Sequence, residues 1–315
     1  MTDDRDCLFQ NYVRAPVAFT HGRGARLYDA AGREYLDFIG GIATSCLGHA
    51  HPRLVGAIAE QAGRYIHVSN LFRIPEQERA ARLLVEASKA PSSGVNAARG
   101  LDRVFFCNSG TEANEAAIKI ARKRGSATGR HQIIVTHKSF HGRTLGSLAA
   151  TGNPRYHQGF GPLPAGFVFV DWNDLGAARA AVTDQTCAVL VEPVLGESGV
   201  FPADPEYLRG LEALCREHDL LFLLDEVQTG VGRTALTRRP FSSARAETGP
   251  ASTASSAATS RPSPRTSVTP STPASPARSR SPIARAFSTR PSSRMVSSTA
   301  ATAAVAIALP PKVEP

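Results

Sequence analysis

Residues 220–230 form an apolar run that closes on two carboxylates and a glycine-containing turn: Leu220-Leu221-Phe222-Leu223-Leu224-Asp225-Glu226-Val227-Gln228-Thr229-Gly230. Five consecutive large apolar residues predict a strand buried on both faces, as in a parallel sheet. The acids then lie at the carboxyl end of the strand, where open α/β sheets place their ligands. We therefore expect Asp225 to face a cation at this edge.

The segments before this run alternate between strand and helix from residue 101 onward. The apolar and β-branched segments predict strands at 104–108, 132–136, 166–170 and 187–194. Apolar residues at helical spacing predict helices at 112–124 and 205–217. Such alternation predicts an α/β fold with a mainly parallel sheet, flanking helices and right-handed crossovers.

The first hundred residues have a different pattern. Alternating polarity around a glycine turn predicts a hairpin at 26–37, and apolar periodicity after a proline predicts helices at 52–64 and 75–88. His49 and His51 have a spacing that could suit a metal ion, but no acidic residue lies next to them in the sequence. No metal site is therefore expected.

Composition and charge divide the chain at about residue 234. Residues 235–315 contain ten Arg and one Lys against two Glu, and thus carry all of the net charge of +9, whereas residues 1–234 balance 25 basic against 25 acidic residues. The second segment is mostly Ser, Thr, Ala, Arg and Pro, which bury too little apolar surface to offset chain entropy. It is predicted to be a disordered low-complexity tail.

Two functional interpretations of this tail stay open. In one, the Arg-rich tail binds nucleic acid beside a non-catalytic α/β scaffold, although aromatic residues for base stacking are almost absent from it. In the other, the codons from about 235 onward are translated out of frame or come from a disrupted gene. No nucleic-acid partner is expected for residues 1–234, because their charge is balanced.

Cysteine usage and hydropathy indicate the compartment. The five cysteines show no paired spacing, which favours buried free thiols and a reducing environment. The N-terminus lacks a charged-then-apolar leader, and no apolar run approaches the roughly 20 residues of a membrane span. A cytoplasmic protein without a membrane partner is expected.

A candidate phosphate-binding turn follows the first predicted strand, at Ser109-Gly110-Thr111-Glu112. Ser-x-x-Glu before a helix is a capping box, in which the serine oxygen accepts from the amide three residues later. The free amides and the positive end of the helix dipole favour a phosphate group. A helix cap without a ligand remains the simpler alternative.

Further polar side chains follow the next strands. Phe140 and Arg143 share one loop, where the ring suits stacking on a flat ligand and the guanidinium suits a carboxylate. Glu192 can hold backbone amides, and Glu197 can pair with an arginine or stay solvated. A strand ending in Asp-Glu is also typical of nucleotide hydrolases, but the Gly-x-x-x-x-Gly-Lys-Ser/Thr loop of that class is absent.

Four motifs together resemble a known family, the class III (ornithine-type) pyridoxal-phosphate aminotransferases, in order and spacing. They are Asn108-Ser109-Gly110-Thr111-Glu112-Ala113-Asn114-Glu115-Ala116, Phe140-His141-Gly142-Arg143-Thr144-Leu145-Gly146, Glu192-Pro193-Val194 and Leu224-Asp225-Glu226-Val227-Gln228-Thr229-Gly230-Val231-Gly232-Arg233-Thr234. Two further stretches resemble the acetylornithine branch of that family: Leu47-Gly48-His49-Ala50-His51-Pro52 and His67-Val68-Ser69-Asn70-Leu71-Phe72. The resemblance covers about residues 10–234.

The resemblance implies a fold, a reaction and an assembly. The fold would be type I of the pyridoxal 5'-phosphate (PLP) transferases, here incomplete, with residues 1–75 as the N-terminal segment of the small domain and the substrate-site loops. Residues 76–234 would be part of the PLP-binding large domain, and 235–315 the tail. The reaction would be transamination of N-acetylornithine, or a similar ω-amino donor, with 2-oxoglutarate in arginine or lysine biosynthesis, by a homodimer.

The resemblance also implies roles in cofactor binding. The phosphate would be held by Ser109, Gly110 and Thr111. Phe140 would stack on the pyridine ring and Val227 would pack on its other face. Asp225 would pair with the ring nitrogen, keeping it protonated so that the ring can accept electrons, and Gln228 would bond the ring hydroxyl.

Two residues are implied in substrate binding. Arg143 would bind the α-carboxylate of the substrate, and Glu197 would help adapt the pocket to both the amino donor and 2-oxoglutarate. Gly196-Glu197-Ser198-Gly199 departs mildly from the usual Gly-Glu-Gly-Gly of the family.

The Schiff-base lysine of the family is the largest departure. Its position, about 29 residues after the aspartate, corresponds to Ala254, and no lysine occurs between Lys138 and Lys312. Without that lysine the site lacks its amine nucleophile and the general base for proton transfer. The resemblance therefore predicts a PLP aminotransferase whose catalytic lysine is missing, so that this chain is inactive.

Overall fold

A computed structural model describes residues 7–88, 102–231, 233–234 and, as backbone only, 305–308. Ala254 and the predicted tail, except for 305–308, lie outside the described residues. The expectation of a disordered tail thus lies outside the described residues for most of its length, but residues 305–308 form a strand, which that expectation did not include.

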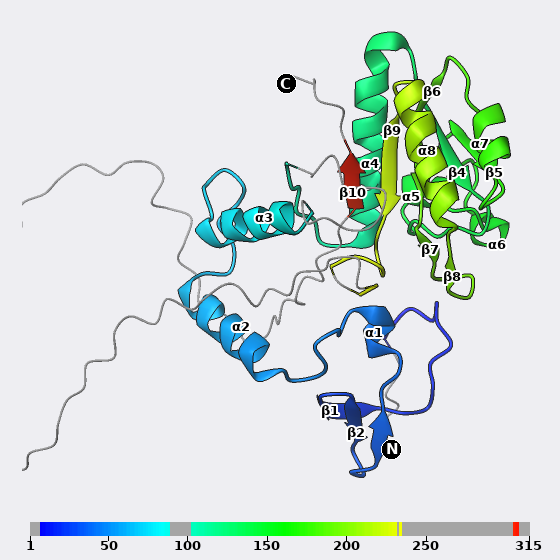
Figure 1. The fold of residues 1–315 in the computed structure, drawn as a ribbon. Helices are drawn as coiled ribbons and strands as arrows, with labels where there is room; N and C mark the ends of the chain where they lie inside the picture. The colour runs from blue at the N-terminus through cyan, green and yellow to red at the C-terminus, as the bar shows by residue number, and fades with distance from the viewer. Residues whose placement is uncertain (1–6, 89–101, 232, 235–304, 309–315) are drawn as a thin grey trace, which may run out of the picture. The chain divides into compact units, whose positions relative to one another are not determined.

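A five-stranded sheet organises the region after residue 102, with strand order β10-β9-β6-β4-β5 (Figure 1). Its strands are β4 (Gln132–Thr136), β5 (Phe167–Val170), β6 (Thr186–Val191), β9 (Leu221–Asp225) and β10 (Val305–Ala308). The first four are mutually parallel, as the α/β pattern predicts, and β10 runs antiparallel along β9. The predicted α/β fold with a mainly parallel sheet is confirmed.

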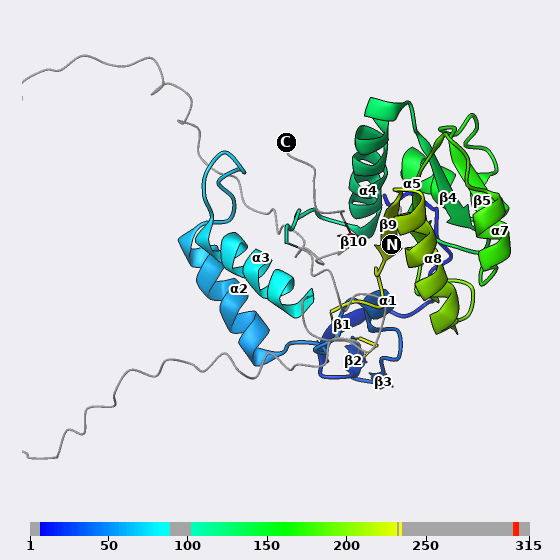
Figure 2. The same ribbon diagram turned by 45° about the horizontal axis from the view of Figure 1, so that its top comes forward.

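The two faces of this sheet are covered by different helices, α4 (Gly110–Gly125) on one side and α7 (Leu175–Ala180) and α8 (Pro205–Glu217) on the other (Figures 1 and 2). Because successive side chains of a strand point to opposite faces, β9 supplies both cores. Phe222 and Leu224 pack in the cluster that contains Leu211 of α8, and Leu221 and Leu223 in the cluster that contains Ala117 of α4. This double burial explains the uninterrupted apolar run.

The helix ends follow local sequence signals. Asp204 caps α8 by accepting from the Glu206 amide at 2.8 Å, and Pro205 occupies the first helical position. The helix then ends at Glu217, as predicted. Shorter helices that were not predicted connect the strands: η1 (Ser126–Thr128), α5 (Leu145–Ala150), α6 (Pro154–His157) and α7.

An antiparallel three-stranded sheet forms near the N-terminus from β1 (Phe19–Arg23), β2 (Arg26–Asp29) and β3 (Glu34–Leu36). It contains the predicted hairpin. Asp29 organises the turn, since its carboxylate accepts from the amides of Ala31 (3.0 Å) and Arg33 (2.9 Å) and from the Tyr35 hydroxyl (3.1 Å). Helices α1 (Gly40–Ala43), α2 (Pro52–Arg64) and α3 (Pro75–Ser88) follow and bury no residue.

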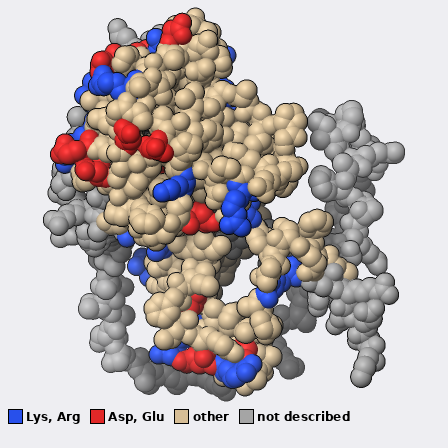
Figure 3. Space-filling model, turned by 90° about the vertical axis from the view of Figure 1, so that its right-hand side faces the viewer, with Lys and Arg blue, Asp and Glu red and all other residues tan. Residues whose placement is uncertain are grey.

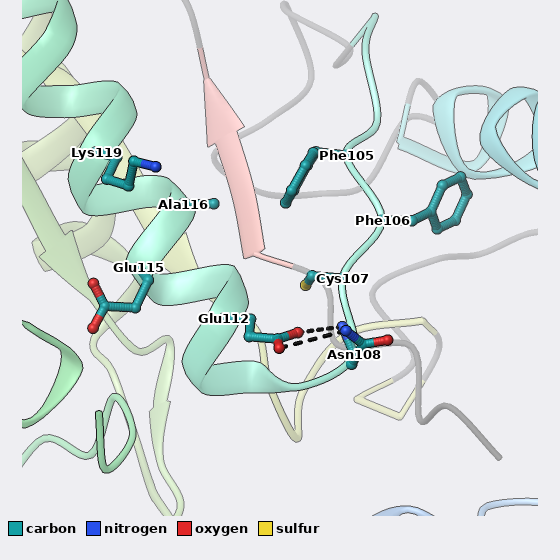
Figure 4. A pocket seen from close by; sticks show the side chains of 8 residues that line it. All are labelled: Phe105, Phe106, Cys107, Asn108, Glu112, Glu115, Ala116 and Lys119. Carbon is teal, nitrogen blue, oxygen red and sulfur yellow. Dashed lines mark hydrogen bonds between the residues drawn. The ribbon is translucent and has the colours of Figure 1, made fainter. Parts of the chain in front are cut away.

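The prediction of a strand at 104–108 is wrong. Phe105 and Phe106 point to opposite sides of an extended segment (Figure 4), but this segment pairs with no strand that the structure describes. The edge of the sheet beside β9 is taken by β10 instead. Phe105 is accordingly 68% exposed. An apolar, β-prone segment becomes a strand only where a neighbour supplies hydrogen-bond partners.

The strand predicted at 187–194 is interrupted after Val191. The chain then forms a separate two-stranded ribbon, β7 (Val194–Leu195) with β8 (Phe201–Pro202). The interruption coincides with Pro193, which has no amide hydrogen to donate to a sheet. It releases Glu192 from the ladder at the carboxyl edge.

Three further observations concern the sequence-based expectations. Cys187 and Cys215 are buried thiols, as expected, whereas Cys7 and Cys46 are exposed. Among the described residues, no helix has both the length and the apolarity to cross a bilayer. On the face in Figure 3, basic and acidic side chains are interspersed rather than gathered by sign, in keeping with the balanced charge of residues 1–234.

Candidate active site

The N-terminus of α4 forms the first part of the site. Ser109 is the N-cap, and its hydroxyl oxygen accepts from the Glu112 amide at 3.3 Å. Glu112 accepts from the Asn108 amide at 2.5 Å, one residue before the N-cap, so only the serine half of the predicted capping box is formed (Figure 4). A Cβ on Gly110 would lie 3.0 Å from a methyl group of Val227, so glycine allows the turn and residue 227 to approach closely.

Asp225 is the last residue of β9, and its carboxylate accepts hydrogen bonds from three neighbours. It is only 2% exposed. One carboxylate oxygen accepts from Asn114 Nδ2 and His141 Nδ1, both at 2.8 Å, and the other accepts from the Val227 amide at 3.0 Å. Because a carboxylate only accepts, the hydrogen of the imidazole lies on Nδ1. Three neighbours therefore orient this carboxylate.

His141 and Asn114 each carry a second polar atom that lacks a partner. His141 Nε2 and Asn114 Oδ1 are buried without a hydrogen-bond partner in the described part of the chain. Neither residue was assigned a role from the sequence, although both lie inside the quoted motifs. Asn114 lies one helical turn after Gly110 and is the polar residue among the otherwise apolar buried positions of α4. A polar residue at an apolar position of a helix is the sequence signal that could have identified it.

The loop after β4 places Phe140 and Arg143. The Phe140 amide donates to Glu192 at 2.8 Å, and its ring meets Tyr156 edge-on at 5.7 Å between ring centres. Arg143 donates to the Tyr12 hydroxyl at 2.7 Å. Tyr12 and Tyr156 were also overlooked, because isolated tyrosines in loops have no pattern that marks them.

Glu192 is a buried carboxyl group in the cavity lining, close enough to Asp225 to feel its charge. Burial raises the pKa of Glu192 to about 7, and the negative charge of Asp225 adds to the rise, whereas His141 and the Phe140 amide oppose it. The expectation that Glu192 holds a backbone amide is confirmed by the bond to Phe140. A carboxyl group that titrates near neutrality thus lies next to one that is held by three donors.

Two loops close the opposite side of the cavity. Gly196 approaches Gln228 so closely that a Cβ there would lie 3.0 Å from the amide oxygen of that side chain. The backbone of Gln228 has φ +92°, which is uncommon for a residue with a side chain and is typical of functional sites. Glu197 accepts from the Tyr156 hydroxyl at 2.6 Å.

These side chains surround one cavity of about 330 Å³. All nine site residues expected from the sequence line it: Ser109, Gly110, Thr111, Phe140, Arg143, Glu197, Asp225, Val227 and Gln228. The rest of the lining is Asn114, His141, Gly142 and Glu192. The tertiary structure thus brings together four motifs that lie up to 119 residues apart in the chain.

A model of the aminotransferase class-III family matches residues 9–237. The chain belongs to the class III aminotransferase family. The chain is 49% identical over 227 residues to the acetylornithine aminotransferase of Halalkalibacterium halodurans, and the match covers 72% of this chain and 56% of that protein. It is 51% identical over 230 residues to that of Gloeobacter violaceus, covering 72% and 55%.

Two solved aminotransferase structures are similar in fold to this chain. The ornithine aminotransferase of Toxoplasma gondii ME49 superimposes with a TM-score of 0.66 at 35% identity, over 73% of this chain and 53% of that one. The N-acetylornithine aminotransferase of Stenotrophomonas maltophilia superimposes with a TM-score of 0.57 at 38% identity, and the match covers 70% of this chain and 53% of that one. The chain therefore spans about half the length of the relatives it matches.

Class III aminotransferases depend on PLP, and a second Toxoplasma gondii structure has partial occupancy of PLP at its active site. The cavity suits the phosphate and the ring of PLP. The capped N-terminus of α4, with glycine at position 110, suits the phosphate, and the ring of Phe140 and the buried carboxylate of Asp225 suit the pyridine ring. Its lining within the described residues includes no lysine. The fit thus extends to the ring and phosphate and not to a covalent attachment.

Among the residues that the structure describes, there is no group of three or more His, Cys, Asp or Glu side chains that could hold a metal ion. His49 instead bonds Asp37 at 2.7 Å. Asp37 also accepts from the Gly40 amide at 2.8 Å, so the acid belongs to the N-terminal loop structure.

Proposed function

We propose that this chain carries the PLP-binding half-site of an acetylornithine-type aminotransferase and that it binds PLP without covalent attachment. The observation that supports this most is the buried Asp225 carboxylate, oriented by Asn114 and His141 at the floor of a cavity whose rim is a capped helix N-terminus. The reaction of the whole enzyme would use N-acetylornithine and 2-oxoglutarate, in a cytoplasmic homodimer. Residues 1–75 would belong to its small domain and 76–234 to its large domain.

The residues of the chain would divide the work of binding. Ser109, the amides that follow it and Thr111 would hold the phosphate at the positive end of α4. Phe140 and Val227 would sandwich the ring, and the buried Asp225 carboxylate would hold a proton on the ring nitrogen.

When bound, PLP supplies a carbonyl that condenses with amines and a ring that withdraws electrons from the substrate carbon. Gln228 would donate to the ring hydroxyl, and Arg143 would orient the substrate through its carboxylate. No described residue in the cavity replaces the lysine that would move a proton at the substrate carbon, so we propose that the chain by itself does not catalyse transamination.

PLP binding by the purified chain tests the half-site. The unchanged chain is titrated with PLP by equilibrium dialysis, together with Asp225→Asn and the matched control Asp184→Asn, an exposed aspartate outside the cavity. Loss of a charged hydrogen bond worth about 1.5–3 kcal/mol should weaken binding by about tenfold or more in Asp225→Asn alone. Equal affinity in the two variants would refute the role of Asp225.

Borohydride reduction of the PLP-loaded chain, followed by mass spectrometry, tests the absence of covalent attachment. We expect no lysine to be labelled stoichiometrically. Stoichiometric labelling of one lysine, or formation of glutamate from 2-oxoglutarate and N-acetylornithine, would show that the site is complete after all.

Reading the gene tests the origin of the segment after 234. We propose that the codons from about 235 onward are read out of frame. Another frame of the same DNA should then encode a lysine near position 254 within a continuing α/β pattern. If no frame does so, the frame hypothesis fails.

A further inference from the structure

Two opposite charges, Arg143 and Glu197, line the same cavity from different loops. Within the described residues no ion pair joins them, and each is held by other groups. The structure therefore keeps apart a guanidinium and a carboxylate that share one cavity.

Arg143 lies among three aromatic rings. Its guanidinium carbon is 5.5 Å from the ring centre of Tyr12, 5.9 Å from that of Phe140 and 5.8 Å from that of Tyr156. Rings at this distance attract a cation through their faces and leave its N–H groups uncommitted. The Tyr12 hydroxyl accepts one of the five N–H donors, so the others can bind a ligand.

Glu197 is held by Tyr156. The phenol donates to its Oε1 at 2.6 Å, and this hydrogen bond, ahead of burial, raises the pKa of Tyr156, which keeps the phenol protonated as a donor. Tyr156 lies on α6, which begins after the cap Asn153 and Pro154. One side chain thus contacts the stacking ring of Phe140, the guanidinium and the carboxylate.

We propose that Tyr156 is a positioning residue: its hydroxyl holds Glu197 and thereby leaves the Arg143 guanidinium open to a carboxylate of the ligand. The class of ligand, a dicarboxylate such as 2-oxoglutarate, rests on the proposed function. Without the hydroxyl, the freed Glu197 carboxylate pairs with Arg143 and competes with the ligand. An exposed ion pair contributes about 0.2–1 kcal/mol, so the competition weakens binding by at most about fivefold.

The substitution Tyr156→Phe removes only the hydroxyl and keeps the ring against Phe140 and Arg143. Calorimetric titration of the full chain with 2-oxoglutarate, in the absence of PLP, should give binding about 1.4-fold to fivefold weaker than in the unchanged chain. Tyr28→Phe is the matched control, because it removes a tyrosine–glutamate hydrogen bond of 2.9 Å (to Glu34) outside the cavity. Its affinity for 2-oxoglutarate should not change.

A second substitution separates positioning from direct contact. Glu197→Gln cannot form an ion pair with Arg143, so in the Tyr156→Phe background it should restore affinity to within about twofold of Glu197→Gln alone. A double variant as weak as Tyr156→Phe would overturn the proposal, because the hydroxyl would then act on the ligand directly or through the fold. Unchanged affinity in Tyr156→Phe, or no 2-oxoglutarate binding by the unchanged chain, would also overturn it.

The Nε–Hε resonance of Arg143 gives a readout without any ligand. Assigned by its disappearance in Arg143→Lys, it should shift in Tyr156→Phe, as a guanidinium does on pairing with a carboxylate, and return in the double variant. An unshifted resonance contradicts the proposal. PLP affinity is measured separately on the same variants, so that failure of the half-site and failure of this inference are distinguished.

Discussion

Helices α2 and α4 have amphipathic sequences of similar length but opposite environments. In α4 the residues Ala117, Ile118 and Ala121 are at most 3% exposed, whereas in α2 the apolar stripe contains Leu54 and Val55, which are 45% and 52% exposed. The stripe of α4 combines Ile118 with the small residues Ala117 and Ala121, and it packs in one cluster with residues of β4, β6 and β9. The comparison teaches that periodicity predicts which side of a helix is apolar, and that only the tertiary partners determine whether this side is buried.

The same contrast separates the two regions to which these helices belong. The region after residue 102 has two apolar clusters around its parallel sheet, and the site lies at the carboxyl edge of that sheet. The N-terminal region is held mainly by local hydrogen bonds, such as those of Asp29. Three predictions test this difference.

Truncating one leucine in each region should have very different effects. Leu223→Ala creates a cavity between β9 and α4, where the side chain is fully buried, and should lower the free energy of unfolding by about 4 kcal/mol. Leu54→Ala on α2 should lower it by less than about 1 kcal/mol. Urea unfolding followed by circular dichroism measures both, and equal losses would refute the contrast between the regions.

Glu192 should make the sheet region less stable at alkaline pH. The pKa of Glu192 is about 7 in the folded chain, against a reference value of 4.5 for the unfolded chain. The folded state therefore holds the proton more tightly, and the free energy of unfolding falls as the pH rises from about 4.5 through 7. Glu192→Gln should therefore raise the free energy of unfolding by about 3 kcal/mol at pH 8 and hardly change it at pH 4. Unfolding curves at the two pH values measure the difference. A gain of the same size at both would show that packing rather than ionisation is responsible.

Alanine substitutions at two glycines with positive φ, Gly142 in the site and Gly32 in the hairpin, should differ in their effect on stability. A Cβ on Gly142 (φ +131°) would lie 2.3 Å from the Thr111 hydroxyl oxygen, whereas a Cβ on Gly32 (φ +76°) would meet nothing within 4 Å. We expect Gly142→Ala to lower stability by about 2 kcal/mol, through backbone strain and overpacking, and Gly32→Ala by about 1 kcal/mol, through strain alone. Thermal unfolding of the two variants checks the order, and a larger loss in Gly32→Ala would contradict it.

Much of the sheet region could be predicted from the sequence because its signals are local. The apolar run up to Asp225 predicts β9, the cap at Ser109 predicts the start of α4, and apolar residues at helical spacing predict α8, all with bounds close to those of the structure. The strand at 104–108 was predicted by the same reasoning and is wrong, because strand formation needs a neighbour. A local pattern contains no information about that neighbour.

The site shows the same division. Ser109, Phe140, Asp225 and the other expected residues could be named from motifs and lie in one cavity. The side chains that orient them, among them Asn114, His141 and Tyr156, were not predicted. Asn114 and His141 contact Asp225 from 111 and 84 residues away in the chain, so these contacts exist only after folding.

The amino-acid sequence alone thus predicts the α/β class of the fold, the capped turn at Ser109 and the strand that ends at Asp225. It also shows that no lysine lies between residues 138 and 312. These features depend on short-range backbone preferences or on composition. The tertiary structure was needed to show that three donors hold Asp225, that Tyr156 contacts both Glu197 and Arg143, and that α4 is buried while α2 is not. The physical reason is that hydrogen bonding and burial at these positions join segments far apart in the chain, whose proximity arises only when the sheet and its helices pack.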